Sequence, residues 1–158
     1  MSLSKLSFGA LVLMLAGCGF EPVYGPGGSA EELRGRIDVV APDDEEGFAL
    51  VKRLEDRLGL PEGPDLSLNA DIRLREEAVG FLPDGEISRF NVIGEVTWRV
   101  SLADGGRTIA TGKERNFTSY SATSTTVATI FAQRDARRRL MVILADDIVV
   151  DLLARDIP

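Results

Sequence analysis

Alternation of apolar and polar residues predicts most of the sheet. Apolar side chains occupy every second position over 66–75 and over 90–102, which is the pattern of strands with one buried face. The turn sequence Phe81–Gly85 separates these two segments, and Asp104–Gly106 leads into a third strand from Arg107 to about Thr118. The three segments therefore predict an antiparallel meander.

A helical spacing of apolar residues precedes this meander. A short strand begins near Leu33 and stops at Pro42, after which Asp43 or Asp44 can cap a helix that ends at Gly59. The expected apolar stripe of this helix consists of Phe48, Val51, Leu54 and Leu58.

A second and longer helix is expected from about Ala128 to Arg155. Its apolar stripe, at steps of four residues, consists of Ala128, Ala132, Ala136, Leu140, Leu144, Ile148 and Leu152, widened by Phe131, Met141 and Ile143. Because Asp146 and Asp147 interrupt the apolar residues, this helix cannot span a membrane and should pack across the sheet.

The order strand, helix, three strands, helix predicts an α+β fold. A right-handed crossover through the first helix would place the first strand parallel to the second. We therefore expect a mixed four-stranded sheet with two helices packed on one face. The other face would carry polar residues suited to water or a hydrated partner, including Arg73, Arg75, Glu95, Thr97 and Arg99.

The first residues of the chain have the layout of a secretory signal. Lys5 is followed by a mainly apolar run from Leu6 to Ala16 and then by Gly17 and Cys18. This run is shorter than the roughly 20 residues that a spanning helix needs. We interpret 1–17 as a signal peptide whose removal leaves Cys18 first. The alternative is an ordinary secretory signal followed by a free or buried thiol.

Length and composition limit the possible architecture of the remaining 141 residues. They are enough for one domain, 31–158, with a core large enough to be stable without disulfides. Cys18 is the single cysteine, so a disulfide within the chain is excluded. They hold 17 basic and 25 acidic residues, which argues against nucleic-acid binding because phosphate neutralisation needs a basic surface. Histidine is absent from the sequence, so most zinc sites and the Ser-His-Asp triad are excluded.

Some residues are candidates for contacts. Glycines and prolines predict a flexible tether over 18–30, in which Phe20 and Tyr24 either contact a partner or lipid or fold back on their own domain. The turn residues Phe81 and Leu82 form an exposed apolar tip that could insert into a partner or disturb lipid packing.

A local basic concentration lies on the long helix. Arg137, Arg138 and Arg139 could bind the phosphates of an anionic lipid head group through bidentate hydrogen bonds. The alternative is a solvated helix surface, in which Asp135 pairs with Arg139 one turn later.

Two motifs resemble known families. The segment Leu15–Cys18 resembles the lipobox of bacterial lipoproteins, and Cys18–Gly25 resembles the start of the LptE family of lipopolysaccharide-assembly lipoproteins. The LptE resemblance extends to the strand around Trp98, to Phe117–Tyr120, and to Arg134–Ala136 in the long helix.

These resemblances imply a function without catalysis, cofactor or metal. Cys18 would carry a diacylglyceryl group and an N-acyl chain. Gly19, where an Asp would signal inner-membrane retention, implies the periplasmic side of the outer membrane. The partners would be the β-barrel LptD, which the protein would plug and help to assemble, and lipopolysaccharide, which it would bind. The main alternative is an auxiliary lipoprotein of a lipid-transporting ABC system. An enzyme is a more distant alternative, because no nucleophile and base can be nominated.

Overall fold

A computed structural model describes residues 28–122, 125–155 and 157–158. The chain divides into two units, Met1–Glu32 and Leu33–Pro158. The described part of the first unit contains one helical turn, α2 (Ser29–Glu32). The expected signal peptide and most of the expected tether lie outside the described residues. So do three of the predicted site residues, which are Cys18, Phe20 and Tyr24.

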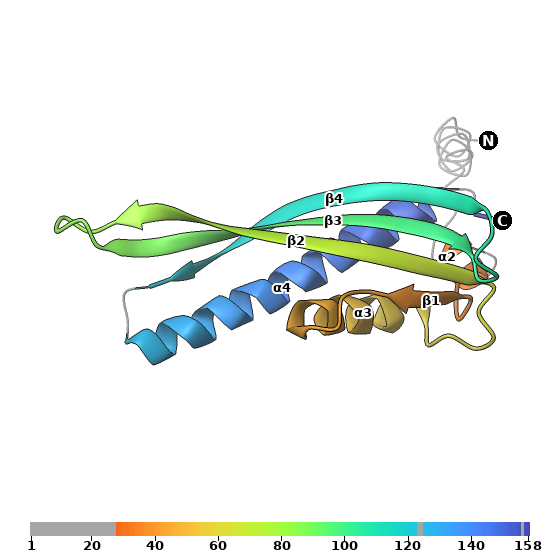
Figure 1. Ribbon diagram of the computed structural model, residues 1–158, viewed down its shortest axis with the longest axis horizontal. Coiled ribbons are helices and arrows are strands. Elements are labelled where there is room, and N and C mark those ends of the chain that lie inside the picture. The colour runs from red at the N-terminus through yellow and green to blue at the C-terminus, as the bar shows by residue number, and fades with distance from the viewer. Residues whose placement is uncertain (1–27, 123–124, 156) are drawn as a thin grey trace, which may run out of the picture. The chain divides into compact units, whose positions relative to one another are not determined.

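The unit Leu33–Pro158 is built on a mixed four-stranded sheet with the order β1-β2-β3-β4 (Figure 1). Its strands are β1 (Ile37–Val40), β2 (Leu66–Phe81), β3 (Ile87–Leu102) and β4 (Thr108–Ser121). β1 pairs parallel with β2, whereas the β2–β3 and β3–β4 pairs are antiparallel. The predicted α+β class and mixed sheet are therefore confirmed.

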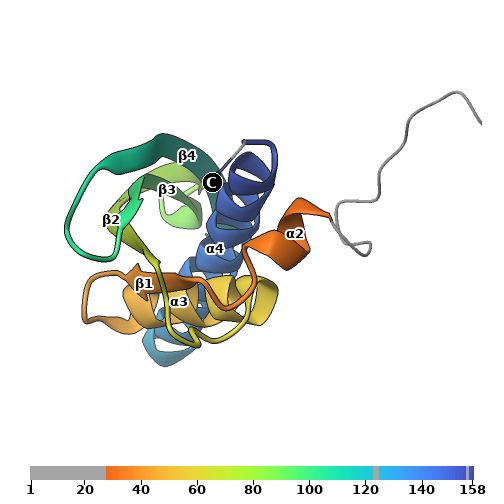
Figure 2. The same ribbon diagram turned by 90° about the vertical axis from the view of Figure 1, so that its right-hand side faces the viewer.

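Two helices, α3 (Glu45–Leu58) and α4 (Thr126–Leu153), cover one face of this sheet, as predicted (Figure 2). Asp44 caps α3, because its carboxylate accepts a hydrogen bond from the backbone N of Gly47 at 2.7 Å. Gly59 ends the helix with φ of 86°, a conformation that favours glycine.

Helix α4 packs directly on the backbone of β3 at Gly94. A Cβ atom at Gly94 would lie 2.9 Å from side-chain carbons of both Leu140 and Leu144 in α4. On β4, a Cβ atom at Gly112 would lie 2.2 Å from the ring of Trp98. Each glycine leaves the space that a larger core side chain fills: Leu140 and Leu144 at Gly94, and Trp98 at Gly112. A side chain at either glycine would therefore require its larger neighbours to move.

Apolar alternation correctly predicts which face of β2 and of β3 is buried. The buried strand residues are Ile37, Leu66, Leu68, Val92, Val96, Trp98, Val100 and Tyr120. Leu33, expected at the start of the first strand, is buried but precedes β1.

The predicted stripe of α3 is wrong at its first residue. Phe48 is 71% exposed, and Leu50 is fully buried instead. The reason lies in the preceding loop, since the Pro42 carbonyl oxygen packs so closely on Gly47 that a Cβ atom there would lie 1.9 Å away. The helix therefore buries Gly47, Leu50, Leu54 and Leu58, and Phe48 points away from the core.

The first turns of α4 also differ from the prediction. Phe131 is 65% exposed and Ala128 is exposed, because the buried stripe begins only at Ala136. In the part of the chain that the structure describes, neither this helix nor any other combines the length and apolarity needed to cross a membrane.

Candidate functional site

The β2–β3 hairpin is longer than predicted, and its tip exposes apolar side chains. In the turn, Leu82 N donates to Glu86 O at 2.8 Å, and Gly85 N donates to Leu82 O at 2.9 Å. Phe81 is 64% exposed and Leu82 is 38% exposed. Val79 and Ile87, which flank them, are exposed as well. The structure thus places Phe81 and Leu82 at an apolar hairpin tip.

A second exposed apolar group lies in the first turns of α4. Val127, Ile130 and Phe131 are all exposed, and the helix begins at the end of the sheet nearest the hairpin tip (Figure 1). Sequence reasoning missed this group, because their spacing is also that of a buried stripe. Two exposed apolar surfaces therefore occur at the same end of the sheet.

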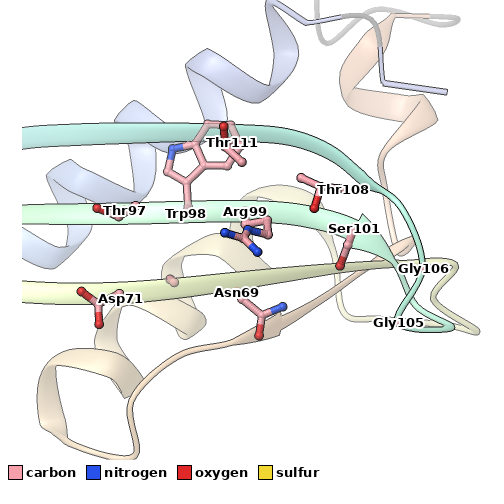
Figure 3. A pocket seen from close by; sticks show the side chains of 11 residues that line it. Asn69, Asp71, Thr97, Trp98, Arg99, Ser101, Gly105, Gly106, Thr108 and Thr111 are labelled. Atoms are coloured by element: carbon pink, nitrogen blue, oxygen red, sulfur yellow. The ribbon is translucent and has the colours of Figure 1, made fainter.

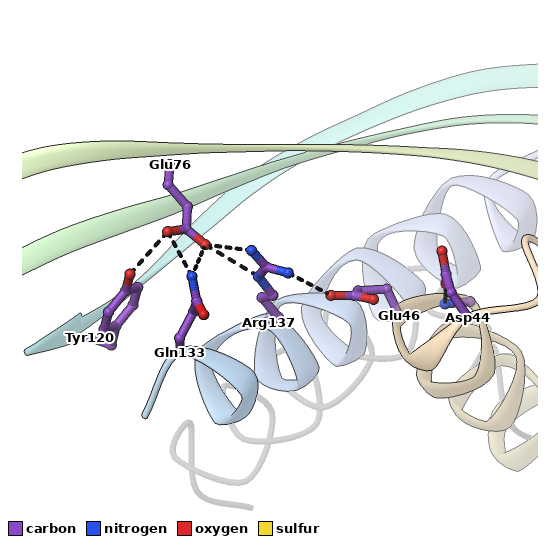
Figure 4. Close-up of polar contacts among 7 residues, drawn as sticks. Asp44, Glu46, Glu76, Tyr120, Gln133 and Arg137 are labelled. Carbon is purple, nitrogen blue, oxygen red and sulfur yellow. Dashed lines mark hydrogen bonds and ion pairs between the residues drawn. The ribbon is translucent and has the colours of Figure 1, made fainter. Parts of the chain in front are cut away.

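A polar cluster links the sheet to both helices (Figure 4). The Glu76 carboxylate of β2 accepts hydrogen bonds from Tyr120 Oη at 2.9 Å and from Gln133 Nε2 at 2.8 Å. Arg137 Nη2 donates to the same carboxylate at 2.8 Å. Arg137 Nη1 also pairs with Glu46 Oε1 of α3 at 3.3 Å. One carboxylate and one guanidinium thus connect β2, β4, α3 and α4.

The contacts of this cluster hold Glu76 and Tyr120 each in one protonation state. Burial raises the pKa of Glu76, but hydrogen bonds from Arg137, Tyr120 and Gln133 outweigh it, so the pKa lies below its usual value. Burial and the neighbouring Glu76 carboxylate raise the pKa of Tyr120 to about 12. At neutral pH the carboxylate is therefore charged and the phenol is neutral.

The three arginines predicted to bind phosphate do not converge. Arg137 turns toward Glu76 in the polar cluster. Arg138 pairs with Asp135 at 2.6 Å, and Arg139 pairs with the same carboxylate, as its spacing predicts. The side chains of Arg138 and Arg139 are 62% and 52% exposed. The helix therefore presents these two arginines to solvent and holds Arg137 against the sheet.

The role of Glu76 could have been found in the sequence. Considered together with its neighbour Glu77, Glu76 suggests a solvated acidic pair. However, Glu76 is an even number of residues from Leu66, Leu68 and Leu74, so its side chain lies on the same face of β2 and points toward the helices.

Metal chemistry has no candidate among the described residues. Nowhere in 28–122, 125–155 or 157–158 do three His, Cys, Asp or Glu side chains gather closely enough to hold an ion. The polar groups that do converge, around Glu76, satisfy one another and connect secondary-structure elements.

The same α+β architecture occurs in solved structures described as lipoproteins. One from Caulobacter crescentus CB15 is 26% identical, with a TM-score of 0.66 over 80% of this chain and 93% of that chain. The rare lipoprotein B of Shewanella oneidensis shares the fold at 16% identity, with a TM-score of 0.56 over 75% of this chain and 93% of that one. A minor lipoprotein from Acinetobacter baumannii is 17% identical, with a TM-score of 0.56 over 75% of this chain and 90% of that one. No curated protein matches the chain.

The family model described as "LptE: Lipopolysaccharide-assembly" matches residues 35–152. The chain therefore belongs to the LptE family. The matched region begins after the N-terminal motif Cys18–Gly25, so membership does not depend on that motif, and the resemblance found in the sequence is confirmed.

Replacing Glu76 with Gln should lower the free energy of unfolding by about 1–3 kcal/mol, because three donors lose a charged acceptor. Urea unfolding at pH 7 of a chain expressed without residues 1–18 measures this loss. The control is Glu77→Gln, which removes the partner of the exposed Arg75 and should cost about 0.5 kcal/mol or less.

The same comparison has a defined pH dependence. Because the folded pKa of Glu76 is lowered, its contribution is present above the ordinary value of 4.5 and is lost as pH falls through the folded value. The raised pKa of Tyr120 means that its contribution is lost as pH rises from 10.0 to about 12. Equal losses for the Glu76 and Glu77 variants, or a Glu76 effect that persists unchanged in strong acid, would contradict this account.

Proposed function

We propose that this protein is the lipid-anchored subunit that, with the β-barrel LptD, assembles lipopolysaccharide at the surface of the outer membrane. The observation that carries the proposal is membership of the LptE family, described as lipopolysaccharide-assembly, over 35–152. Shared fold with proteins described as lipoproteins supports the lipid anchor. The protein would act by binding, without enzymatic activity or a cofactor.

The anchor would be Cys18, with a diacylglyceryl group on its sulfur and an acyl chain on its amine. Each buried methylene contributes about 0.8 kcal/mol, so two or three chains hold a protein on a membrane almost permanently. Residues 18–30 would then form a tether on the periplasmic side of the outer membrane. Phe20 and Tyr24 would lie beside the acyl chains and contact either lipid or the partner.

The body would act as a plug in the barrel and help it to assemble. A plug must be rigid, and here α3 and α4 are joined to the sheet by a continuous core and by the Glu76 cluster. It must also tolerate a polar lumen, because the interior of such barrels is water-lined. The sheet face opposite the helices has the charged and hydroxyl side chains that this environment requires.

The first test is purification of the acylated full chain in mild detergent. The proposal expects a large β-barrel to copurify and mass spectrometry to find acylated Cys18. The variant Cys18→Ala should be released from the membrane fraction. Recovery of an ABC transporter or its periplasmic channel instead would favour the alternative of an auxiliary lipoprotein.

The hairpin tip supplies a second test. If Phe81 and Leu82 insert into the barrel or its lipid, replacing both with Ser should reduce barrel recovery several-fold, because their apolar contacts are lost. Phe48→Ser with Val150→Ser is the matched control, since both are exposed apolar residues on the helices. An unchanged yield for the tip variant would remove this role.

The arginines of α4 supply a third test. The hypothesis is that Arg137, Arg138 and Arg139 bind the phosphates of lipid A. The triple Ala variant should lose lipopolysaccharide binding, and Arg138→Ala with Arg139→Ala should cause most of the loss, because these side chains are exposed. Arg137→Ala alone measures how much lipopolysaccharide binding is lost when Glu76 loses its guanidinium partner.

The control for this series is Arg155→Ala, two residues after the end of α4. Arg155 pairs with Asp151 four residues earlier, in the geometry of Asp135 and Arg139. Binding that survives in the triple variant would exclude the arginine site, whereas equal losses in the control would indicate a general effect of charge.

A further inference from the structure

The sheet face opposite the helices, here called the open face, reverses the charge balance of the chain. In the part of unit Leu33–Pro158 that the structure describes, no helix covers it (Figure 2). By strand alternation and register it carries six basic residues, namely Arg73, Arg75, Arg89, Arg99, Lys113 and Arg115. Its four acidic residues are Asp38, Asp71, Glu77 and Glu95. The whole chain, by contrast, has 18 basic and 25 acidic residues.

The centre of the open face has more cations than carboxylates. Arg73, Glu95 and Arg115 face one another in register across β2, β3 and β4. Lys113 Nζ also contacts Glu95 Oε1 at 2.8 Å. The hydrogen bond from Lys113 and the nearby guanidinium groups hold the pKa of Glu95 below its usual range. Arg73 Nε also lies 3.3 Å from Asp71 Oδ1, so three cations here face two carboxylates. The side chains of Arg73 and Lys113 are 78% and 58% exposed.

A groove of 650 Å³ lies beside this row, toward the β3–β4 turn (Figure 3). Its polar lining includes the amide, hydroxyl and guanidinium side chains of Asn69, Thr97, Arg99, Ser101, Thr108 and Thr111. The one carboxylate in the lining, Asp71, pairs with Arg73 at 3.3 Å. Asn69, Arg99 and Thr111 are in register on adjacent strands. With the described residues the Arg99 guanidinium forms neither a hydrogen bond nor an ion pair. The groove thus presents an unpaired cation among hydroxyl and amide groups that can hydrogen-bond to a carboxylate.

An apolar row adjoins the cationic one. Arg75, Ile93 and Phe117 face one another in register, and Phe117 is 58% exposed on this otherwise polar face. Aromatic residues and arginine are enriched where protein interfaces bury their centres. This combination favours a protein partner, because an anionic lipid surface would not use ordered hydroxyl groups and a groove around one arginine.

We propose that the open face docks against an acidic, water-lined wall of a protein partner, with Arg99 binding a partner carboxylate in the groove. The partner is the lumen wall of the β-barrel, so this inference rests on the proposed function. The net negative charge of the chain would suggest a basic partner wall. The open face, however, has a net positive charge, so the wall that it contacts should be acidic. Complementary charge would set the orientation of the plug and exclude wrong orientations.

The test reverses charge in the full acylated chain. The open-face variant combines Arg73→Glu, Arg99→Glu and Arg115→Glu, and the control combines Arg34→Glu, Lys52→Glu and Arg134→Glu, which are exposed positions off this face. Barrel recovery should fall by about tenfold or more in the open-face variant and change little in the control. Recovery of the barrel by the wild-type chain should also fall as salt is raised. The open-face variant should unfold at a lower temperature than the wild-type chain, because its new carboxylates repel Glu95. Thermal unfolding should still show both variants folded at the temperature of the recovery assay, which separates docking from folding.

The outcomes distinguish this inference from the proposed function. If the wild-type chain recovers no barrel, the proposed function fails. If it recovers the barrel and both variants do so equally, the docking inference is overturned and the proposed function stands. If the open-face variant keeps the barrel but loses binding to vesicles containing phosphatidylglycerol, the face binds lipid and the inference is also overturned. Arg99→Gln alone should reproduce part of the loss, and full recovery would exclude Arg99 as the anchor.

Discussion

The direct packing of α4 on β3 is the contact on which the rest of the structure depends. Leu140 and Leu144 lie over Gly94, where even a methyl group would come within 2.9 Å of both side chains. Because α4 packs on this face of the sheet, the face is part of the core, and the opposite face is not. Because strand side chains alternate, every residue of β2, β3 and β4 is then assigned to the helices or to the open face.

The same assignment explains why an acidic protein can have a basic surface. Arginine and lysine at alternate positions of the strands gather on the open face, while most carboxylates lie on helices, turns and termini. Glu76 is an exception on the covered face. Its burial is compatible with its charge because Arg137, Tyr120 and Gln133 all donate to it. A half-buried charge at the edge of the core thereby connects four elements.

Our proposal of a lipid-anchored binding protein calls for recognition surfaces away from the N-terminal end of unit Leu33–Pro158. Unit Leu33–Pro158 begins near β1, and the hairpin tip lies at the other end of β2 (Figure 1). The apolar tip, the exposed arginines Arg138 and Arg139 of α4 and the open face are three surfaces of different chemistry on one unit. In our proposal they serve lipid, lipopolysaccharide and the barrel wall, and no reacting group is required.

Local pattern alone determined the class of the fold, because periods of two and of three to four residues specify strands and helices. It also narrowed the cap of α3 to Asp43 or Asp44, and it identified the end of α3 at Gly59 and the exposed tip at Phe81 and Leu82. The family resemblance likewise came from short motifs.

Tertiary structure decided whatever depends on which neighbours a side chain meets. The rotation of α3 that exposes Phe48 follows from the contact of Pro42 with Gly47. The separation of Arg137 from Arg138 and Arg139 follows from Glu76, which is 61 residues away in the sequence. The unpaired state of Arg99 depends on the residues that β2 and β4 place beside it. Local periodicity cannot predict such contacts, because the residues are far apart in the sequence.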